Sequence, residues 1–356
     1  MFRVFRRLEF PSKTGQHVPT TQYQYADLFE AAQVGGKQAF YRVKKIPKTD
    51  AIAFVRIAET STMEINFRDG QKIEWHFFSK RDSKRYNLED TKQLIVKLYS
   101  ETCGEATEVP ELMFAKTSTS SYCCTPNCTT KIVQFVRYIC TLFNAPVNEL
   151  DICPSKCHHL EEIQSVEGLK KSREVVIREG TVSHEEMRRV LGGFESTKMT
   201  ILCNPQPNFT FDGTISIKKI RAYASSWFQG PMLLNLVNCE KVHLTGSRIA
   251  EEDLKIFLHE WFKENTGCGT ILSLRIVSEC NIFGFRDIHE PSGQKEWDLD
   301  KIAQGLSSFQ QPLPSIRGLD HSIMRRFRRK IDGTIIDVQK AFQGLEFRGT
   351  RQQVAH

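Results

Sequence analysis

The sequence predicts an α/β fold: a leucine-rich-repeat-like solenoid of strand-helix units, with a small N-terminal portion of helices and antiparallel strands and a C-terminal β-hairpin. Between Lys131 and Ile276, short apolar strands alternate with amphipathic helices, as in folds whose parallel strands are joined by helical crossovers. The matched apolar positions Leu150, Val176 and Ile201 follow one another at steps of 26 and 25 residues. These steps fit the roughly 20 to 29 residues of a leucine-rich repeat.

An internal repeat is the second observation. The segment 175–191 aligns with 242–258 at a constant offset of 67 residues. In each copy a strand ends, a turn follows, and paired acidic residues that include Glu185 or Glu252 begin a helix, where negative charge suits the helix dipole. Any strand followed by an amphipathic helix resembles another to some extent. The alignment nevertheless favours a repeated strand-turn-helix unit.

The N-terminal residues divide into two parts. Residues 1–24 are basic and polar and contain proline and glycine, which predicts an irregular basic arm. Residues 25–45 predict two short helices separated by Gly35 and Gly36.

Residues 46–130 predict a small mixed α/β portion. Alternating apolar residues indicate an antiparallel sheet with strands at 51–57, 62–67 and 72–77. Asp69 and Gly70 are a hairpin signal between the last two strands. The apolar spacing of 88–99 predicts a helix, and the Thr, Ser, Pro and Cys content of 102–130 predicts a loop.

Residues 131–350 are expected to form the repeat-like domain. Its predicted strands are Glu149–Ile152, Glu174–Ile177, Met199–Leu202, Thr214–Ile217, Lys241–Leu244 and Leu272–Ile276. The segment 327–336 then predicts a β-hairpin whose turn contains Asp332 and Gly333.

Composition indicates an ordinary globular chain. The 356 residues are 40% hydrophobic and 26% charged, with a formal net charge of +7. No apolar run approaches the roughly 20 residues of a spanning helix, and the first residues lack the features of a secretory signal. The eleven scattered cysteines favour reduced thiols. We therefore expect an intracellular protein, cytoplasmic and/or nuclear, that does not bind a membrane.

A series of motifs follows a recognisable order through the repeat-like domain. Its core positions are Trp227, Leu233, Leu236, Leu244, Phe257, Leu258, Trp261, Asp332 and Gly333. With the strands around them, they resemble the type 2 F-box-associated domain of nematodes over roughly residues 130 to 350, and the resemblance implies a final strand at 345–347 after the hairpin. Large rings on amphipathic segments favour core packing of the two tryptophans over ligand stacking.

The resemblance implies a non-enzymatic protein-recognition module that presents an unknown target protein to a cullin-type (SCF) ubiquitin ligase through a Skp-type adaptor. The helices predicted in residues 25–45 resemble the second half of an F-box. Its apolar, adaptor-binding positions would be Leu28, Phe29, Ala32, Val34, Phe40 and Val43. The first half is missing from residues 1–24, which contain only Phe10-Pro11 and polar sequence. A degenerate copy that has lost adaptor binding is therefore the other form of this expectation.

Two cysteine pairs raise the possibility of zinc. Cys124 and Cys128, with Cys153 and Cys157, would supply four soft ligands. Neither pair has the tight Cys-x2-Cys spacing of a zinc knuckle, so buried free cysteines are favoured and no metal is predicted.

A basic run, 325–330, supplies the alternative function. Five basic residues around Phe327 could grip phosphates while the ring stacks on a base, as in a nucleic-acid-binding protein. The turn signal directly after the run favours a hairpin strand instead. The sequence contains no phosphate-binding, hydrolase or metalloprotease motif, so we predict no catalytic residue and no cofactor.

Overall fold

The computed structural model shows a mixed α/β fold with parallel and antiparallel strand pairs and several helices. The chain divides into two compact units, Met1–Val175 and Val176–His356. The structure describes residues 28, 32, 36–45, 52–59, 62–68, 70–78, 92–102, 105–116, 120–125, 128–144, 146–154, 160–178, 180–223, 225–247, 249–262, 271, 273–277, 310–312, 316–317, 323–329, 335–341 and 344–350.

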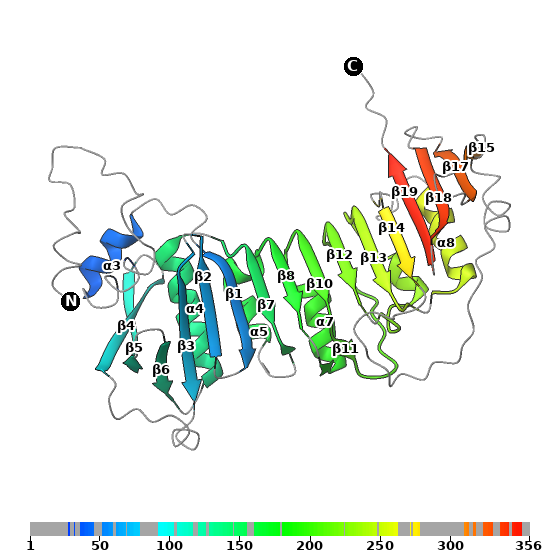
Figure 1. The fold of residues 1–356 in the computed structure, drawn as a ribbon. Coiled ribbons are helices and arrows are strands. Elements are labelled where there is room, and N and C mark those ends of the chain that lie inside the picture. Colours follow the sequence, from blue (N-terminus) through cyan, green and yellow to red (C-terminus); the bar gives the residue numbers. More distant parts are fainter. Residues whose placement is uncertain are drawn as a thin grey trace, which may run out of the picture. The chain divides into compact units, whose positions relative to one another are not determined.

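The first unit contains a strand meander and a long helix (Figure 1). Strand β1 pairs antiparallel with β2 and parallel with β7, whereas β3 pairs with β2 and with β6. Strand β5 pairs antiparallel with both β4 and β6. The elements are α3 (Gly36–Lys44), β1 (Ile52–Glu59), β2 (Thr62–Phe67), β3 (Lys72–Phe78), β4 (Lys92–Thr102), β5 (Glu105–Lys116), β6 (Ser120–Cys124), α4 (Cys128–Phe143), β7 (Glu149–Ile152), α5 (Leu160–Gln164) and α6 (Glu167–Lys170).

Local sequence signals explain the β1–β2–β3 sheet, and its prediction is confirmed. Side chains of β2 are alternately buried and partly exposed, as expected of a strand with one face against the core. At the turn, Gly70 has φ +85°, a conformation that glycine adopts without strain. The Gly70 N–H donates to the Phe67 carbonyl at 3.1 Å, and the Phe67 N–H donates to the Gln71 carbonyl at 2.9 Å.

Aromatic side chains of α4 form the core against this sheet. The ring of Phe135 lies edge-on to Trp75 of β3 at 4.7 Å between centroids. Tyr138, one turn further along α4, contacts the ring of Phe40 in α3 at 5.4 Å. Helix α4 therefore packs on both the sheet and α3, and in Figure 1 it lies behind β1, β2 and β3.

Two predictions for residues 88–130 are wrong. The expected helix at 88–99 is strand β4 where the structure describes it, and the expected loop at 102–130 contains β5, β6 and the first residues of α4. Strands β4 and β5 pair from Lys92↔Lys116 to Thr102↔Glu105. The apolar residues of β4 fit the spacing of a helix as well as that of a strand. Pairing with β5 decides between the two, and β5 lies outside the stretch of sequence from which the helix is predicted.

The second unit contains a run of parallel strands followed by antiparallel strands (Figure 1). Strands β10, β12, β13 and β14 pair parallel in that order, β19 then pairs antiparallel with β14, and β18 and β17 follow. From the unit boundary onward, the elements are β8 (Glu174–Ile177), β9 (Thr181–Val182), α7 (His184–Gly193), β10 (Lys198–Ile201), β11 (Asn204–Pro205), β12 (Lys219–Ala222), η4 (Gly230–Leu233), β13 (Lys241–Thr245), α8 (Glu251–Phe262), β14 (Ser273–Val277), β15 (Gln310–Pro312), β16 (Ile316–Arg317), β17 (Ile323–Arg329), β18 (Ile335–Ala341) and β19 (Gly344–Thr350).

Five of the six strands predicted between 131 and 276 are confirmed to within one residue at each end, as β7, β8, β10, β13 and β14. The sixth, Thr214–Ile217, is wrong because the parallel strand at this place in the order is β12, five residues later. Ile215 instead forms a single isolated bridge with Leu236. Both segments alternate buried and exposed residues, so burial alone does not distinguish them.

The predicted repeat appears in the helix starts, because α7 and α8 begin 67 residues apart. At the start of α7, the Ser183 hydroxyl accepts from the Glu186 N–H at 3.2 Å, and the Glu186 carboxylate accepts from the Ser183 N–H at 2.9 Å. At the start of α8, Asp253 accepts from the Ala250 N–H at 3.0 Å. The second copy therefore keeps the carboxylate half of the capping box and lacks the hydroxyl half.

Completing the second cap is expected to stabilise α8. Ala250→Ser adds the missing acceptor and should raise the free energy of unfolding by about 0.5–1 kcal/mol. The reciprocal control, Ser183→Ala, should lower it by about 1 kcal/mol. Urea unfolding measures both changes as opposite shifts of the midpoint at constant slope. Destabilisation by both substitutions would show that the two helix starts are not equivalent.

The C-terminal strands match the predicted hairpin and final strand. Strands β17 and β18 pair antiparallel up to Arg328↔Ile335, and β19 contains the predicted segment 345–347. The predicted turn residues Asp332 and Gly333 lie outside the described residues. Among helices in the described part of the chain, none combines the length and apolar character needed to cross a bilayer.

Candidate functional site

The described family-motif residues lie in the core of the second unit. The Trp261 indole N–H donates to the Ile271 carbonyl at 3.0 Å, and the residue is fully buried. Trp227 is 8% exposed and lies edge-on to the ring of Phe209. The other buried members are Leu233, Leu236, Leu244, Phe257 and Leu258. These side chains hold the strands and helices together and are not on a binding surface.

Four of the six predicted adaptor-binding residues are buried within the first unit. They are Leu28, Ala32, Phe40 and Val43. Phe29 and Val34 lie outside the described residues. Since Phe40 contacts Tyr138 of α4, this apolar side chain already has a partner within the chain.

The cysteines of the zinc hypothesis are described only in part. Cys153 is a partly exposed thiol outside any disulfide, whereas Cys157 and the side chains of Cys124 and Cys128 lie outside the described set. No group of three potential metal ligands occurs among the residues with described positions. Burial raises the pKa of Cys140 and that of Cys239 to about 12, so both thiols are protonated at neutral pH.

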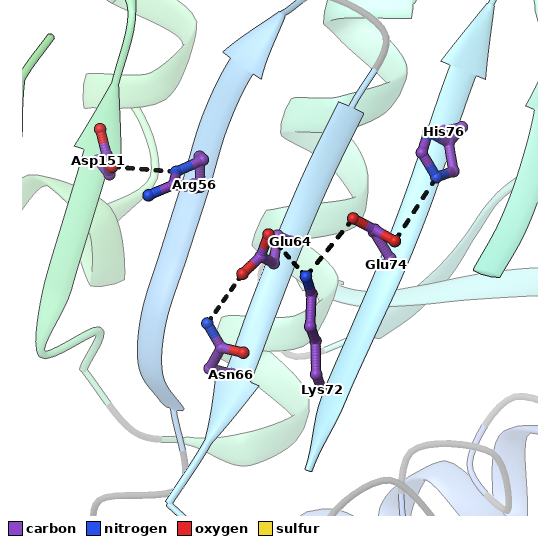
Figure 2. A network of polar contacts seen from close by, with 7 residues as sticks. All are labelled: Arg56, Glu64, Asn66, Lys72, Glu74, His76 and Asp151. Carbon is purple, nitrogen blue, oxygen red and sulfur yellow. Dashed lines mark hydrogen bonds and ion pairs between the residues drawn. The ribbon is translucent and has the colours of Figure 1, made fainter. Parts of the chain in front are cut away.

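The outer face of β7, β1, β2 and β3 carries a mixed-charge network (Figure 2). The Lys72 ammonium lies between two carboxylates, 3.1 Å from Glu64 and 3.6 Å from Glu74. Asn66 donates to Glu64 at 3.1 Å, and His76 lies 3.8 Å from Glu74. Opposite charges therefore offset one another across this face.

The pKa values of the network follow from these contacts. Burial by itself raises the pKa of Glu64, but hydrogen bonds from Asn66 and Lys72 and the positive charges of Lys72 and Arg56 together hold it below its ordinary value. The hydrogen bond to Glu64 raises the pKa of Lys72. Burial lowers the pKa of His76, and the nearby Glu74 opposes this only in part. The imidazole is therefore neutral at pH 7.

The pair Arg56–Asp151 differs because its carboxylate is buried. The Arg56 Nε donates to Asp151 at 3.0 Å, with side-chain exposures of 40% and 1%. Arg56→Ala should lower the free energy of unfolding by about 1–2 kcal/mol, because the buried carboxylate loses a charged donor. The control is Lys72→Ala, whose wild-type side chain is 49% exposed; it should cost less than about 1 kcal/mol. Thermal unfolding measures which substitution lowers stability more. An equal or larger loss of stability for Lys72→Ala would contradict this prediction.

The outer face of the parallel strands in the second unit is basic. We call it the basic face. Its residues are Lys198, Thr200, Lys219, Arg221, Lys241, His243, Ser273 and Arg275. The intervening residues of the same strands are buried and apolar. The sheet therefore has an apolar core face and a polar face whose described side chains are exposed or partly exposed.

Backbone register aligns the basic face in two rows. One row runs Lys198↔Lys219↔Lys241, and the other contains Arg221↔His243. Lys219, Arg221 and Lys241 are exposed, and Lys198 and His243 are partly exposed. Like charges directly opposite one another destabilise a sheet. These rows of like charge lower the stability of the sheet. The binding of an anion therefore explains them better than folding does.

Sequence reasoning missed the basic face. With the strand placed at Thr214–Ile217, Lys219 and Arg221 fell after the predicted sheet. The usable signal is the alternation of basic and apolar residues in Lys219–Ala222, which recurs in Lys241–Leu244. Matching these strands side by side would have placed the cations in rows.

Comparisons of the chain with protein-family models, with curated proteins and with solved structures give no match.

Proposed function

We propose that this protein is a non-enzymatic protein-recognition module of the F-box-associated kind, with a leucine-rich-repeat-like solenoid architecture. The carrying observation is the outward, polar face of four parallel strands in register, backed by an apolar core. Solenoids use such extended faces to bind other proteins. The target protein binds on this face and is recognised by its surface charges.

Strand spacing supports the architecture. Strands β10, β12 and β13 begin at Lys198, Lys219 and Lys241, which are steps of 21 and 22 residues. Both steps lie within the roughly 20 to 29 residues of a leucine-rich repeat. The step to Ser273 of β14 is longer because it includes α8. The helix-bearing units are thus the longer ones, and the strands still stack in register.

Of the two forms of the proposal, a receptor that engages a Skp-type adaptor and a degenerate copy that does not, burial favours the second. Leu28, Ala32, Phe40 and Val43 would have to leave the core to contact an adaptor. A standard interface buries about 800 Å² per partner, and apolar side chains supply its centre. We therefore propose that this chain binds its target without recruiting the cullin-type ligase through these residues.

Adaptor binding is tested by pull-down of the purified full chain with a Skp-type adaptor, beside an F-box protein that binds it. The expected result is no retention of this chain. Retention that is lost in the Leu28→Asp plus Phe29→Asp variant, while circular dichroism is unchanged, would restore the receptor form.

Target recognition is tested by affinity purification from cells with two double variants. Arg221→Glu plus Lys241→Glu changes the basic face, whereas Arg173→Glu plus Arg188→Glu makes the same charge change at exposed residues outside it. Proteins captured by the wild type and the control, but lost from the face variant, are the expected result. Identical capture by the wild type, the control and the face variant would show that the basic face is not the recognition surface.

A further inference from the structure

We propose that the basic face binds an acidic segment of the partner protein, held in an extended conformation. This inference rests on the proposed function and names the chemistry of the target. It requires that the face attract negative charge, that it match an extended chain, and that it favour protein over nucleic acid.

Charge is the first requirement. The eight residues of the basic face include five lysines and arginines and no acidic residue. Within the described part of the chain, no carboxylate lies at ion-pair distance from Lys219, Arg221 or Lys241. The outer face of the first unit differs, since Lys72 there lies between two carboxylates (Figure 2).

The edge of the basic face is set by the next strand. Backbone register places Glu346 of β19 opposite Arg275 of β14, and Arg348 opposite Ser273. From β19 onward, the strands therefore contribute both acidic and basic residues. The uniformly basic part is centred on β12 and β13, with Lys219, Arg221 and Lys241 as its exposed cations.

Geometry is the second requirement. Successive outward residues of one strand, such as Lys219 and Arg221, are two residues apart, which is roughly 6.6 Å along the sheet. Side chains on one side of an extended peptide repeat at the same interval. Alternate acidic residues of a segment that runs along β12 can thus face successive cations. Lys241, on the neighbouring strand about 4.8 Å away, adds charge beside them.

The choice between protein and nucleic acid depends on aromatic residues. Proteins that bind single strands stack bases on exposed rings. Two rings lie on or directly beside this face among the described residues: His243, and Tyr223, which continues the alternation two residues after Arg221. Both are partly exposed, and their centroids lie 6.4 Å apart at a tilt of 39°. Cations occupy both rows of the face, whereas the rings occur at one place only, which favours the carboxylates of a peptide over a series of stacked bases.

Fluorescence anisotropy of the full chain with a labelled octa-glutamate peptide tests the proposal. The wild type should bind this probe, and added salt should weaken the binding. Arg221→Glu plus Lys241→Glu should raise the dissociation constant by at least about tenfold, as expected for lost charge pairs. Arg173→Glu plus Arg188→Glu should change the dissociation constant by less than about twofold, because exposed charges away from the basic face contribute little to binding. Circular dichroism confirms that each variant is folded.

Three outcomes would overturn the proposal. Equal weakening by both double variants would show that net charge alone attracts the probe. Binding of labelled octathymidylate, lost only in the face variant, with no octa-glutamate binding would identify nucleic acid as the ligand. Absence of octa-glutamate binding, while the face variant still loses its partners in affinity purification, would reject the acidic segment and leave the proposed function standing.

Discussion

Trp261→Ala is expected to lower the free energy of unfolding of the second unit by about 3–5 kcal/mol. Trp261 is a fully buried side chain of α8, and its removal leaves a cavity that the surrounding strands fill only in part. The Ile271 carbonyl also loses its donor in a buried setting. Equilibrium unfolding followed by circular dichroism measures the loss.

Trp261→Phe is the matched control because it keeps a ring and removes the indole N–H. It should cost about 1–3 kcal/mol, which is the range for a buried acceptor left unsatisfied plus the smaller ring. A loss for Trp261→Phe as large as that for Trp261→Ala would show that the hydrogen bond to Ile271, and not the volume, dominates. No loss with either variant would contradict the packing described for this helix.

Gly230→Ala should destabilise the second unit by about 3 kcal/mol, at or above the upper end of the range for overpacked sites. A Cβ atom at Gly230 would overlap the Cβ and Cγ atoms of Asp253. Asp253 cannot move away at no cost, because its carboxylate accepts the Ala250 N–H at the start of α8. The substitution therefore disturbs both the η4–α8 contact and the helix cap.

Gly192→Ala is the control in the same unit. Its added Cβ atom would meet only Phe211, at 3.9 Å, which is ordinary van der Waals contact. Since Gly192 lies in α7, alanine should stabilise the helix by about 0.5–1 kcal/mol. Thermal unfolding separates the two glycines. Equal effects at both positions would mean that close approach to Asp253 does not constrain Gly230.

Elements with complete local signals could be predicted from the sequence. The antiparallel strands between 52 and 78 have alternating apolar residues and Gly70 at the turn, so period and turn agree. The helix starts at Ser183 and Ala250 share an acidic residue at the third helical position. In both cases the deciding residues are neighbours in the sequence.

Features that depend on distant partners could not be predicted in the same way. Strand β4 was mistaken for a helix because its pairing with β5 decides its conformation. The basic face was missed because β12 was placed five residues too early, which removed Lys219 and Arg221 from the sheet. Register between strands about 20 residues apart brings these cations together, and no single window of sequence contains it.

Each unit also contains a buried cysteine whose alkylation would report local opening of that unit. The buried thiols of Cys123 in the first unit and Cys239 in the second are shielded from alkylating reagents in the folded chain, and each becomes reactive when its surroundings open. Timed alkylation followed by peptide mass spectrometry would therefore report two separate opening rates from one unmodified chain. A ligand that holds the second unit closed would slow modification of Cys239 and leave that of Cys123 unchanged, so its site of action could be assigned without any label.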